Sequence, residues 1–370
     1  MRLAFVYDAI WPWETGGVQK RVWELSRRLA SDHDVHWYGL KYWDGPEVIE
    51  REGVTIHGVG VSRDLYVGGR RSITEAITFS AQLMRPLLRA DVDVIDCQEF
   101  PYFPIFASKF GAVRNNATLC VTWHEVWGSY WQEYLGYWGL IGRAVERISA
   151  RPPDFNIAVS DQTQRDILDL GVDEATILPN GIATREIEAV PAGDEPIDTL
   201  FVGRLISEKG VDMLIDAVTE LQSDDPDVSC LLVGEGPEEA TLKAMIESQG
   251  LDANVRLVPF REQYEDILGL MKAAEVFVLP SRREGFGISV LEALACGTPV
   301  VTIDHPRNAA TELVEDGVTG VVADPMPKAI AAAIVRARCE ADEGACRAFA
   351  SDYDWDRISQ RAATLYQGMI

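Results

Sequence analysis

Residues 280–299 read PSRREGFGISVLEALACGTP, and this stretch decides the fold of the second half of the chain. The short apolar run Glu275–Leu279 precedes it and has the composition of a buried strand. After Gly287 the apolar residues have the spacing of one helix face: Ile288, Leu291, Leu294 and Ala295. Gly297 followed by Pro299 is a helix stop. The stretch therefore predicts a strand, a glycine-rich turn and a short helix.

The turn and the helix start have the features of a binding site for an anion. A glycine-rich turn lets backbone N–H groups approach a ligand closely, and a helix N-terminus favours negative charge. Glu284 lies in the turn and Glu292 lies in the helix, so both carboxylates can face one bound molecule. A nucleoside diphosphate sugar offers phosphates to the amides and hydroxyls to the carboxylates. The alternative is that both glutamates are solvated charges and that the glycines only form a turn.

The same motif resembles a known family. Glu-Gly-Phe-Gly at 284–287 and Glu-Ala-Leu-Ala-Cys-Gly-Thr-Pro-Val at 292–300 are similar to the E-x7-E signature of the retaining glycosyltransferases of family 4, which have the GT-B architecture. The resemblance spans nearly the whole chain and is strongest over residues 199–320. It implies an α/β fold with two Rossmann-like, doubly wound parallel-sheet domains that face a central cleft.

The expected domains follow from this resemblance and from the alternation of strand and helix patterns. Residues 1–187 form an N-terminal, acceptor-binding Rossmann-like domain, and residues 188–350 form a C-terminal, donor-binding one. The segment 190–196, VPAGDEP, has the composition of a linker. Residues 351–370 contain an amphipathic helix that, by resemblance, crosses back to the first domain.

Composition restricts the class of protein. The 370 residues are 47% hydrophobic, which allows a sizeable core in two domains of ordinary size. No apolar run is long enough to span a membrane, and the apolar run at the N-terminus is too short for a signal peptide. The six cysteines are scattered, with no Cys-x-x-Cys pair and no metal-ligand spacing. These features predict a cytoplasmic protein in a reducing compartment.

The charge is strongly negative and uneven. The net charge of −24 argues against a nucleic-acid partner and suggests a halophilic protein that stays soluble in a salt-rich cytoplasm. Residues 1–190 carry 19 basic and 26 acidic side chains, a net −7, so −17 falls on residues 191–370, and the first half holds nine of the ten tryptophans. We therefore expect any peripheral contact with the inner membrane surface in the N-terminal domain. The alternative is that these tryptophans are core residues.

A second motif follows the strand pattern at 199–202. Arg204 and Lys209 are the only basic residues of the loop that comes next, and together they could hold a diphosphate. Two isolated basic residues are more often solvated, but G-R-L-x-x-x-K-G is similar to the family's diphosphate-binding motif. The chain lacks the Gly-Lys-Ser/Thr order of a P-loop.

The resemblance implies a full set of donor-binding residues: Gly16, Gly17, Gly203, Arg204, Lys209, Gly234, Glu284, Gly285, Phe286, Gly287, Ile288 and Glu292. Within this set, Arg204, Lys209 and the amides of Gly287 and Ile288 would bind the diphosphate. Glu284 would bind hydroxyls of the donor sugar and Glu292 the ribose. Gly234 belongs to a V-G-x-G-P turn near the nucleotide.

The first half contributes a glycine pair and a basic helix. Gly16 and Gly17 lie at a turn between a strand and a helix, where the family contacts the donor; a tight turn is the simpler explanation. The helix that follows is expected to expose four basic side chains, either to solvent or to anionic lipid: Lys20, Arg21, Arg27 and Arg28.

His124 follows the strand pattern at 118–122, so it lies at the carboxyl end of a parallel strand, where open sheets place their sites. An aromatic-rich segment comes next and could form an apolar wall for an acceptor. A lone histidine is more often structural. In the resembled family, however, a histidine at this place hydrogen-bonds the transferred sugar, so His124, Glu284, Arg204 and Lys209 form the expected catalytic set.

These expectations describe a retaining, metal-independent glycosyltransferase without a cofactor, which moves a hexose-type sugar from a nucleoside diphosphate sugar to a glycan, a lipid-linked molecule or another hydroxyl acceptor. A glycoside hydrolase, a nucleotide-sugar epimerase of the same shape and a non-catalytic nucleotide-sugar-binding protein are the alternatives. Product analysis separates these classes from one another. A transferase yields a glycosylated acceptor, a hydrolase free sugar, an epimerase an isomerised donor, and a binding protein no product.

Overall fold

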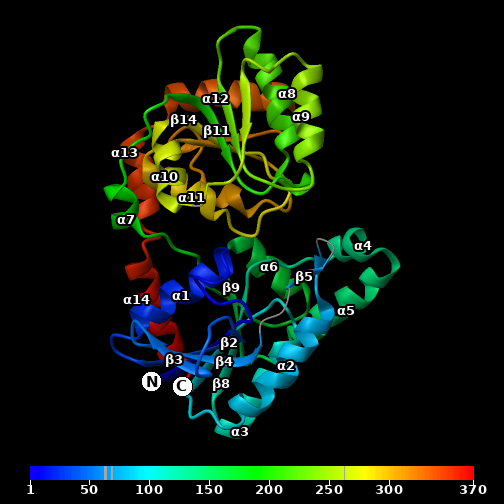
Figure 1. Ribbon diagram of the computed structural model, residues 1–370, viewed down its shortest axis with the longest axis vertical. Coiled ribbons are helices and arrows are strands. Elements are labelled where there is room, and N and C mark those ends of the chain that lie inside the picture. Colours follow the sequence, from blue (N-terminus) through cyan, green and yellow to red (C-terminus); the bar gives the residue numbers. More distant parts are fainter. Residues whose placement is uncertain (62–64, 68–69, 262) are drawn as a thin grey trace. The chain divides into compact units, whose positions relative to one another are not determined.

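The computed structural model describes residues 1–61, 65–67, 70–261 and 263–370 (Figure 1). The chain forms two units. Unit 1 comprises Met1–Asn180 together with Trp355–Ile370, and unit 2 comprises Gly181–Asp354. Each unit is built on one mainly parallel sheet with helices on both faces. The doubly wound α/β architecture expected from the sequence is confirmed.

The sheet of unit 1 has the strand order β10-β9-β8-β7-β1-β2-β4-β3. All neighbours pair in parallel except β3 and β4, which are antiparallel. A separate antiparallel pair, β5 and β6, completes the strands described in this unit. The strands are β1 (Arg2–Val6), β2 (Asp34–Lys41), β3 (Val48–Arg51), β4 (Val54–Val61), β5 (Tyr66–Val67), β6 (Arg70–Arg71), β7 (Val94–Gln98), β8 (Thr118–Trp123), β9 (Phe155–Ala158) and β10 (Thr176–Ile177).

The sheet of unit 2 has the order β13-β12-β11-β14-β15-β16, and all its pairs are parallel. Numbered within the unit, this is the 3-2-1-4-5-6 order of nucleotide-binding doubly wound sheets. The strands are β11 (Ile197–Val202), β12 (Cys230–Val233), β13 (Val255–Val258), β14 (Ala274–Leu279), β15 (Val300–Ile303) and β16 (Gly320–Ala323).

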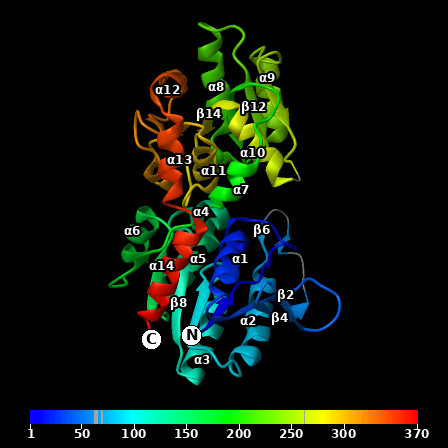
Figure 2. The same ribbon diagram turned by 90° about the vertical axis from the view of Figure 1, so that its left-hand side faces the viewer.

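The helices of unit 1 cover both faces of its sheet, with α2 packed on α3 and the C-terminal helix α14 packed on α1 (Figure 2). Side-chain caps support two of them: Ser72 accepts a hydrogen bond from the Glu75 amide before α2, and Ser160 accepts one from the Thr163 amide before α6. Serine is among the residues preferred at an N-cap because its hydroxyl can accept such a bond. The helices are α1 (Gly17–Leu29), α2 (Ile73–Leu87), α3 (Phe103–Asn115), α4 (Tyr130–Leu135), η1 (Gly136–Trp138), α5 (Gly139–Ser149), α6 (Asp161–Asp169) and α14 (Trp355–Gln367).

In unit 2, α8 contacts α9 and α12 on one side of the sheet, and α11 contacts α10 and α13 on the other (Figure 1). Strand β14 is buried from Val276 to Leu279, as the apolar run before the central motif predicts. The helices are α7 (Thr184–Ala189), η2 (Ser207–Lys209), α8 (Val211–Gln222), α9 (Glu239–Ser248), α10 (Tyr264–Ala273), α11 (Ile288–Cys296), η3 (Ala309–Leu313), α12 (Pro327–Glu340) and α13 (Glu343–Ser351).

Candidate active site

The switch point of the unit 2 sheet lies between β11 and β14, which are neighbours although two strands separate them in the chain. Open α/β sheets bind ligands at such a point, outside the carboxyl ends of the strands. The loop with Arg204 and Lys209 follows β11, and the loop with Glu284 follows β14. The topology therefore brings the two motifs of the sequence to one edge of the sheet.

An ion pair joins the two loops. The Lys209 ammonium donates a hydrogen bond to Oε2 of Glu284, and the two side chains are only 20% and 17% exposed. Gly210 has a φ of +63°, and a Cβ there would lie 2.1 Å from the carbonyl oxygen of Pro280. Only glycine allows the loops to approach this closely, so the Lys-Gly order is required by the packing as well as by the charge.

Arg282 also links the loop after β14 to the segment after β11. Its guanidinium donates to both carboxylate oxygens of Asp212, at 3.1 and 2.7 Å, and to the carbonyl of Ser207 at 2.8 Å. Its backbone N–H donates to the carbonyl of Glu208 at 2.7 Å. The sequence does not single out Arg282, because nothing in its local motif identifies a partner some seventy positions away.

The backbone of Glu284 is held by the segment after β15. Its N–H donates to the carbonyl of Arg307 at 2.8 Å, and its carbonyl accepts from the Ala309 amide at 2.9 Å. The glutamate is therefore bound by its main chain on one side and by Lys209 through its side chain. This leaves the carboxylate little freedom of position.

Helix α11 begins directly after this turn. Gly287 caps it with a φ of +96°, and a Cβ at this position would lie 2.8 Å from the Cβ of Ala310. The first N–H groups of a helix have no partner within the helix. The amides at Ile288 and Ser289 therefore present donors at the positive end of the helix dipole.

Glu292 is buried in α11, and its carboxylate is hydrogen-bonded within unit 2. Its Oε1 accepts a hydrogen bond of 2.5 Å from the Tyr264 hydroxyl at the start of α10. Burial, followed by the nearby Glu292 charge, raises the pKa of Tyr264 well above its ordinary value, so the phenol stays protonated and donating. Tyr264 therefore supports Glu292 through its hydroxyl.

The remaining predicted donor residues of unit 2 differ in their surroundings. The Arg204 side chain is exposed, and none of the acidic side chains that the structure describes pairs with it. A Cβ at Gly234 would lie 1.9 Å from the carbonyl oxygen of Gly203, so close packing of two loops explains Gly234, whereas a Cβ at Gly203 would lie 3.1 Å from the Phe201 ring. Phe286 is buried against Tyr353, with ring centroids 6.1 Å apart, and Gly285 lies beside it in the turn.

In unit 1, Gly16 and Gly17 lie at the start of α1. Gly16 precedes the helix in an extended conformation, and both residues are exposed. A Cβ at Gly16 would meet only the end of the flexible Gln19 side chain, at 2.6 Å. Unlike Gly210, this position does not require glycine for packing.

His124 follows β8 and is held by a chain of buried polar groups. Its Nε2 lies 2.8 Å from Oε1 of Gln98. The Gln98 amide nitrogen donates to Asp96 at 3.1 Å, and Asp96 also accepts from the hydroxyls of Thr122 and Tyr366. Because Gln98 donates to Asp96, its carbonyl oxygen faces His124, and Nε2 of the imidazole carries the proton.

The His124 ring is neutral. Burial, assisted by the positive charge of Arg21, lowers its pKa to about 3. With Nε2 donating to Gln98, Nδ1 is left as an acceptor. A neutral imidazole with a fixed acceptor can receive a hydrogen bond from a hydroxyl group, which is compatible with the role that the family resemblance implies for His124. The sequence motifs do not identify Asp96 and Gln98, which orient the ring. Both residues lie in β7, the strand that pairs with β8.

The expected exposure of Arg21 is wrong. The side chain is only 1% exposed, and its guanidinium donates to the carbonyls of Leu178 and Pro179 and to Oδ1 of Asn180 at 2.9, 2.6 and 3.0 Å. Buried carbonyls need donors, and the planar guanidinium satisfies three acceptors at once.

Two more of the basic residues of α1 are engaged within the protein. Arg27 and Arg28 both pair with Glu24, and Arg28 also pairs with Asp356 of α14 at 2.7 Å. These contacts explain three of the four basic residues without a lipid partner, so α1 does not have the free cationic face that would support membrane contact.

Glu99 is a buried acid next to His124. It is 4% exposed, and its Oε2 accepts a hydrogen bond from the His124 backbone N–H at 3.1 Å. Burial is the main cause that raises the pKa of Glu99 from 4.5 to about 8. Hydrogen bonds from backbone N–H groups favour the ionised form and lower this pKa, whereas the negative charge of Glu125 raises it further. Glu99 is therefore largely a neutral acid at pH 7.

This pKa predicts a pH dependence of stability. In the folded chain the Glu99 carboxyl is protonated below about pH 8, and in the unfolded chain only below about pH 4.5. Its contribution to stability is therefore fully present below the unfolded pKa and is lost as the pH rises through the folded one. We expect Glu99→Gln to show a smaller fall in Tm than the unmodified chain between about pH 6 and about pH 9.

Thermal unfolding across this range measures the effect. Glu133→Gln, which changes an exposed glutamate of α4, is the matched control and should retain the full pH dependence. Equal pH profiles for Glu99→Gln and the unmodified chain would contradict the assignment.

Comparisons with known proteins identify the class. The model of the glycosyl transferases group 1 matches residues 183–349, and the model of glycosyltransferase family 4 matches residues 15–186. Together the two models cover residues 15–349, and the fold of two doubly wound α/β units is that of a GT-B glycosyltransferase. The chain belongs to glycosyltransferase family 4, as its E-x7-E motif implied.

Individual relatives agree with this class. The chain is 33% identical over 235 residues to glycogen synthase of Mycobacterium tuberculosis, covering 60% of this chain and 56% of the relative. It is 38% identical over 165 residues to a GDP-mannose-dependent phosphatidylinositol monomannoside mannosyltransferase of Mycolicibacterium smegmatis, covering 42% of this chain and 41% of the relative. The chain thus spans about half the length of these curated relatives.

Among solved structures, HepE from Anabaena, solved in complex with UDP, is similar over 100% of both chains with a TM-score of 0.77 and 20% identity. At this identity the likeness concerns the fold. Within the part of the chain that the structure describes, no helix is both long and apolar enough to cross a membrane.

Proposed function

We propose that the chain is a retaining, metal-independent glycosyltransferase that transfers a hexose-type sugar from a nucleoside diphosphate sugar to a hydroxyl of a glycan or a lipid-linked acceptor. The observation that carries the proposal is the Lys209–Glu284 ion pair at the switch point, beside the N-terminus of α11. The cation and the helix amides suit the diphosphate of such a donor, and the carboxylate beside them suits the hydroxyls of its sugar.

In this proposal, Arg204, Lys209 and the amides of Gly287 and Ile288 bind the diphosphate. Arg204 is suited to this because its guanidinium is exposed and pairs with none of the described carboxylates. Binding of the diphosphate by cations and amides stabilises its negative charge as it leaves, which is the usual main source of catalysis in such reactions. The positive charge comes from the chain itself, which is why we propose that no metal ion is required.

The carboxylates bind the hydroxyl groups of the donor. Glu284 receives hydroxyls of the sugar, and Glu292, supported by the Tyr264 hydroxyl, receives the ribose. His124 receives a hydroxyl of the transferred sugar through its neutral ring. The bond to phosphate breaks early in an oxocarbenium-like transition state, and the configuration at the anomeric carbon is retained.

Relatives support a nucleotide-sugar donor without fixing the base. The related mannosyltransferase is described as GDP-mannose-dependent, and HepE was solved with UDP and with UDP-glucose. The lipid-linked class of acceptor is favoured by the phosphatidylinositol mannoside acceptor named for one relative. We propose a cytoplasmic enzyme, peripheral at the inner membrane surface, and the net charge of −24 favours a salt-rich cytoplasm.

Thermal shift tests the donor site. The purified chain in high salt and EDTA is heated with UDP, GDP, ADP and their sugar conjugates. A ligand that binds only the folded state raises Tm by mass action, by about 2.7 kcal/mol of stability at a hundredfold excess over Kd. We expect one nucleoside diphosphate to raise Tm with EDTA present.

Product analysis with the selected donor then separates the reaction types. Transfer to an added hydroxyl acceptor with an unchanged anomeric configuration supports the proposal. Free sugar or an isomerised donor as the main product would contradict it, as would the absence of a Tm shift with every nucleotide.

A further inference from the structure

The hairpin of α4, η1 and α5 exposes a group of large apolar side chains on unit 1. Tyr137 and Trp138 are 97% and 70% exposed, and three side chains of α5 are more than half exposed: Leu140, Ile141 and Ile148. Scattered exposed apolar residues are ordinary, but five large ones on one short hairpin indicate an interaction surface. We call this group, with the arginines described below, the α5 surface.

Other residues fill the inner side of the hairpin, so the exposed apolar side chains are not part of its core. A Cβ at Gly139 would lie 2.2 Å from the carbonyl oxygen of Trp131, and one at Gly142 would lie 2.4 Å from its ring. Trp131 is buried and packs on Trp127, with ring centroids 4.6 Å apart. The aromatic segment after His124 therefore anchors the hairpin and directs the other side of α5 to solvent.

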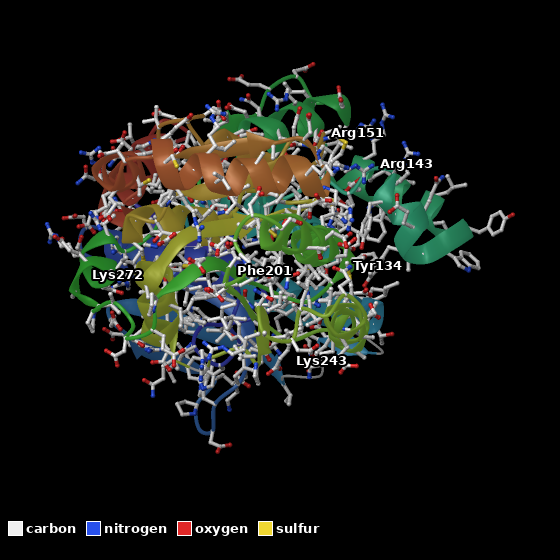
Figure 3. All side chains as sticks on the ribbon, turned by 90° about the horizontal axis from the view of Figure 1, so that it is seen from above. Tyr134, Arg143, Arg151, Phe201, Lys243 and Lys272 are labelled. Atoms are coloured by element: carbon white, nitrogen blue, oxygen red, sulfur yellow. The ribbon has the colours of Figure 1, made fainter. Side chains whose placement is uncertain are left out.

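Basic side chains run beside the apolar group. Arg143, Arg147 and Arg151 recur at the four-residue spacing of one helix face and are all exposed. Figure 3 labels Arg143 on α5 and Arg151, which lies two residues after the helix ends at Ser149. In the described part of the chain, none of the three pairs with an acidic side chain.

The acidic residue of α5 points the other way. Glu146 is 1% exposed and accepts hydrogen bonds from three groups of the interior: the Tyr102 hydroxyl and the amides of Trp127 and Gly128. The outer side of α5 is therefore purely apolar and cationic, although the whole chain carries a net charge of −24. Charge of this sign on so acidic a protein is complementary to an anionic surface.

We propose that the α5 surface docks on an anionic lipid bilayer, with the aromatic and aliphatic side chains at the boundary between headgroups and acyl chains and the arginines on lipid phosphates. A helix with one apolar stripe and an arginine-rich edge is suited to this interface. Tyrosine and tryptophan prefer the same depth. The remaining negative charge of the chain does not prevent local contact, because ions screen charges beyond about 8 Å at physiological salt.

This inference gives a location to the membrane contact included in the proposed function, and its test needs no sugar donor. Failure of vesicle binding is therefore distinguishable from failure of the transferase proposal.

Vesicle co-sedimentation of the full chain tests the proposal. Vesicles of phosphatidylcholine alone are compared with vesicles of phosphatidylcholine and phosphatidylglycerol in equal parts. We expect the unmodified chain to bind the mixed vesicles and to bind pure phosphatidylcholine at least about tenfold more weakly. Trp138→Ser with Ile141→Ser, and separately Arg143→Gln with Arg151→Gln, should each weaken binding to mixed vesicles by about tenfold or more.

Two controls accompany these variants. Val335→Ser changes an exposed apolar residue of α12, and Lys243→Gln changes an exposed cation of α9; both should leave vesicle binding unchanged. All the substituted side chains are exposed, so Tm should not change. Quenching of tryptophan emission by brominated lipids provides a second measurement, and Trp138→Phe should remove part of it.

Three results would overturn the proposal: no binding of the unmodified chain to mixed vesicles, equal binding by the α5 variants and the controls, or self-association without lipid that Trp138→Ser with Ile141→Ser abolishes. The last result would identify the α5 surface as a contact between copies of this chain.

Discussion

Lys209→Ala is expected to lower kcat/KM for the sugar donor by roughly 10- to 150-fold, because a hydrogen bond to a charged group contributes roughly 1.5–3 kcal/mol. In the folded chain Lys209 pairs with Glu284, and both side chains are largely shielded from water. The variant removes a cation from the proposed diphosphate site and leaves the carboxylate of Glu284 without its partner. Initial rates over a range of donor concentrations, together with the Tm shift by the selected nucleotide, measure the loss.

Lys243→Ala is the matched control. Lys243 also pairs with a glutamate, Glu239, at 2.6 Å, but the pair is exposed on α9. Exposed pairs of this kind contribute only about 0.3–0.5 kcal/mol to stability. Equal kinetics for the two variants would remove Lys209 from the proposed site.

His124→Ala is expected to retain the Tm shift by the nucleotide while transfer falls by roughly 10- to 100-fold. The ring is neutral, and its acceptor position is set by Gln98 and Asp96. Its proposed contact is with a hydroxyl of the transferred sugar and not with the nucleotide, so a nucleoside diphosphate should bind the variant as before. Rates of transfer at saturating donor, compared with nucleotide Tm shifts, separate the two effects.

His33→Ala provides the control, since His33 is half-buried in the turn after α1, outside the proposed site. It should leave transfer unchanged. If His124→Ala also abolishes the nucleotide shift, His124 supports donor binding or folding, and the assigned role in transfer is wrong.

Much of the fold could be predicted from local pattern. Strand β14, the turn and helix α11 follow from apolar spacing and from Gly297 and Pro299 over twenty residues. Such signals are local, because helix and strand periodicity and the conformations of glycine and proline depend on near neighbours. The motifs around Arg204 and Glu284 are also local, so the class of site could be read from them.

Contacts between distant residues could not be predicted in the same way. The side chain of Arg21 has the pattern of an exposed helix cation, yet it satisfies carbonyls more than 150 positions away. Phe286 lies inside a ligand-like motif, yet it packs on Tyr353. In both cases the neighbours come from other elements, and the sequence near the residue contains no information about them.

By itself, the sequence determined two doubly wound α/β halves, the turn at Glu284–Gly287 and the identity of the charged residues that follow β11 and β14. Only the tertiary structure decided that the Lys209 ammonium meets Glu284, that Tyr264 supports Glu292, that Asp96 and Gln98 orient His124, and which basic side chains face solvent. The physical reason is the parallel sheet: strands far apart in the chain lie side by side, so loops at their carboxyl ends meet at distances that local periodicity does not specify.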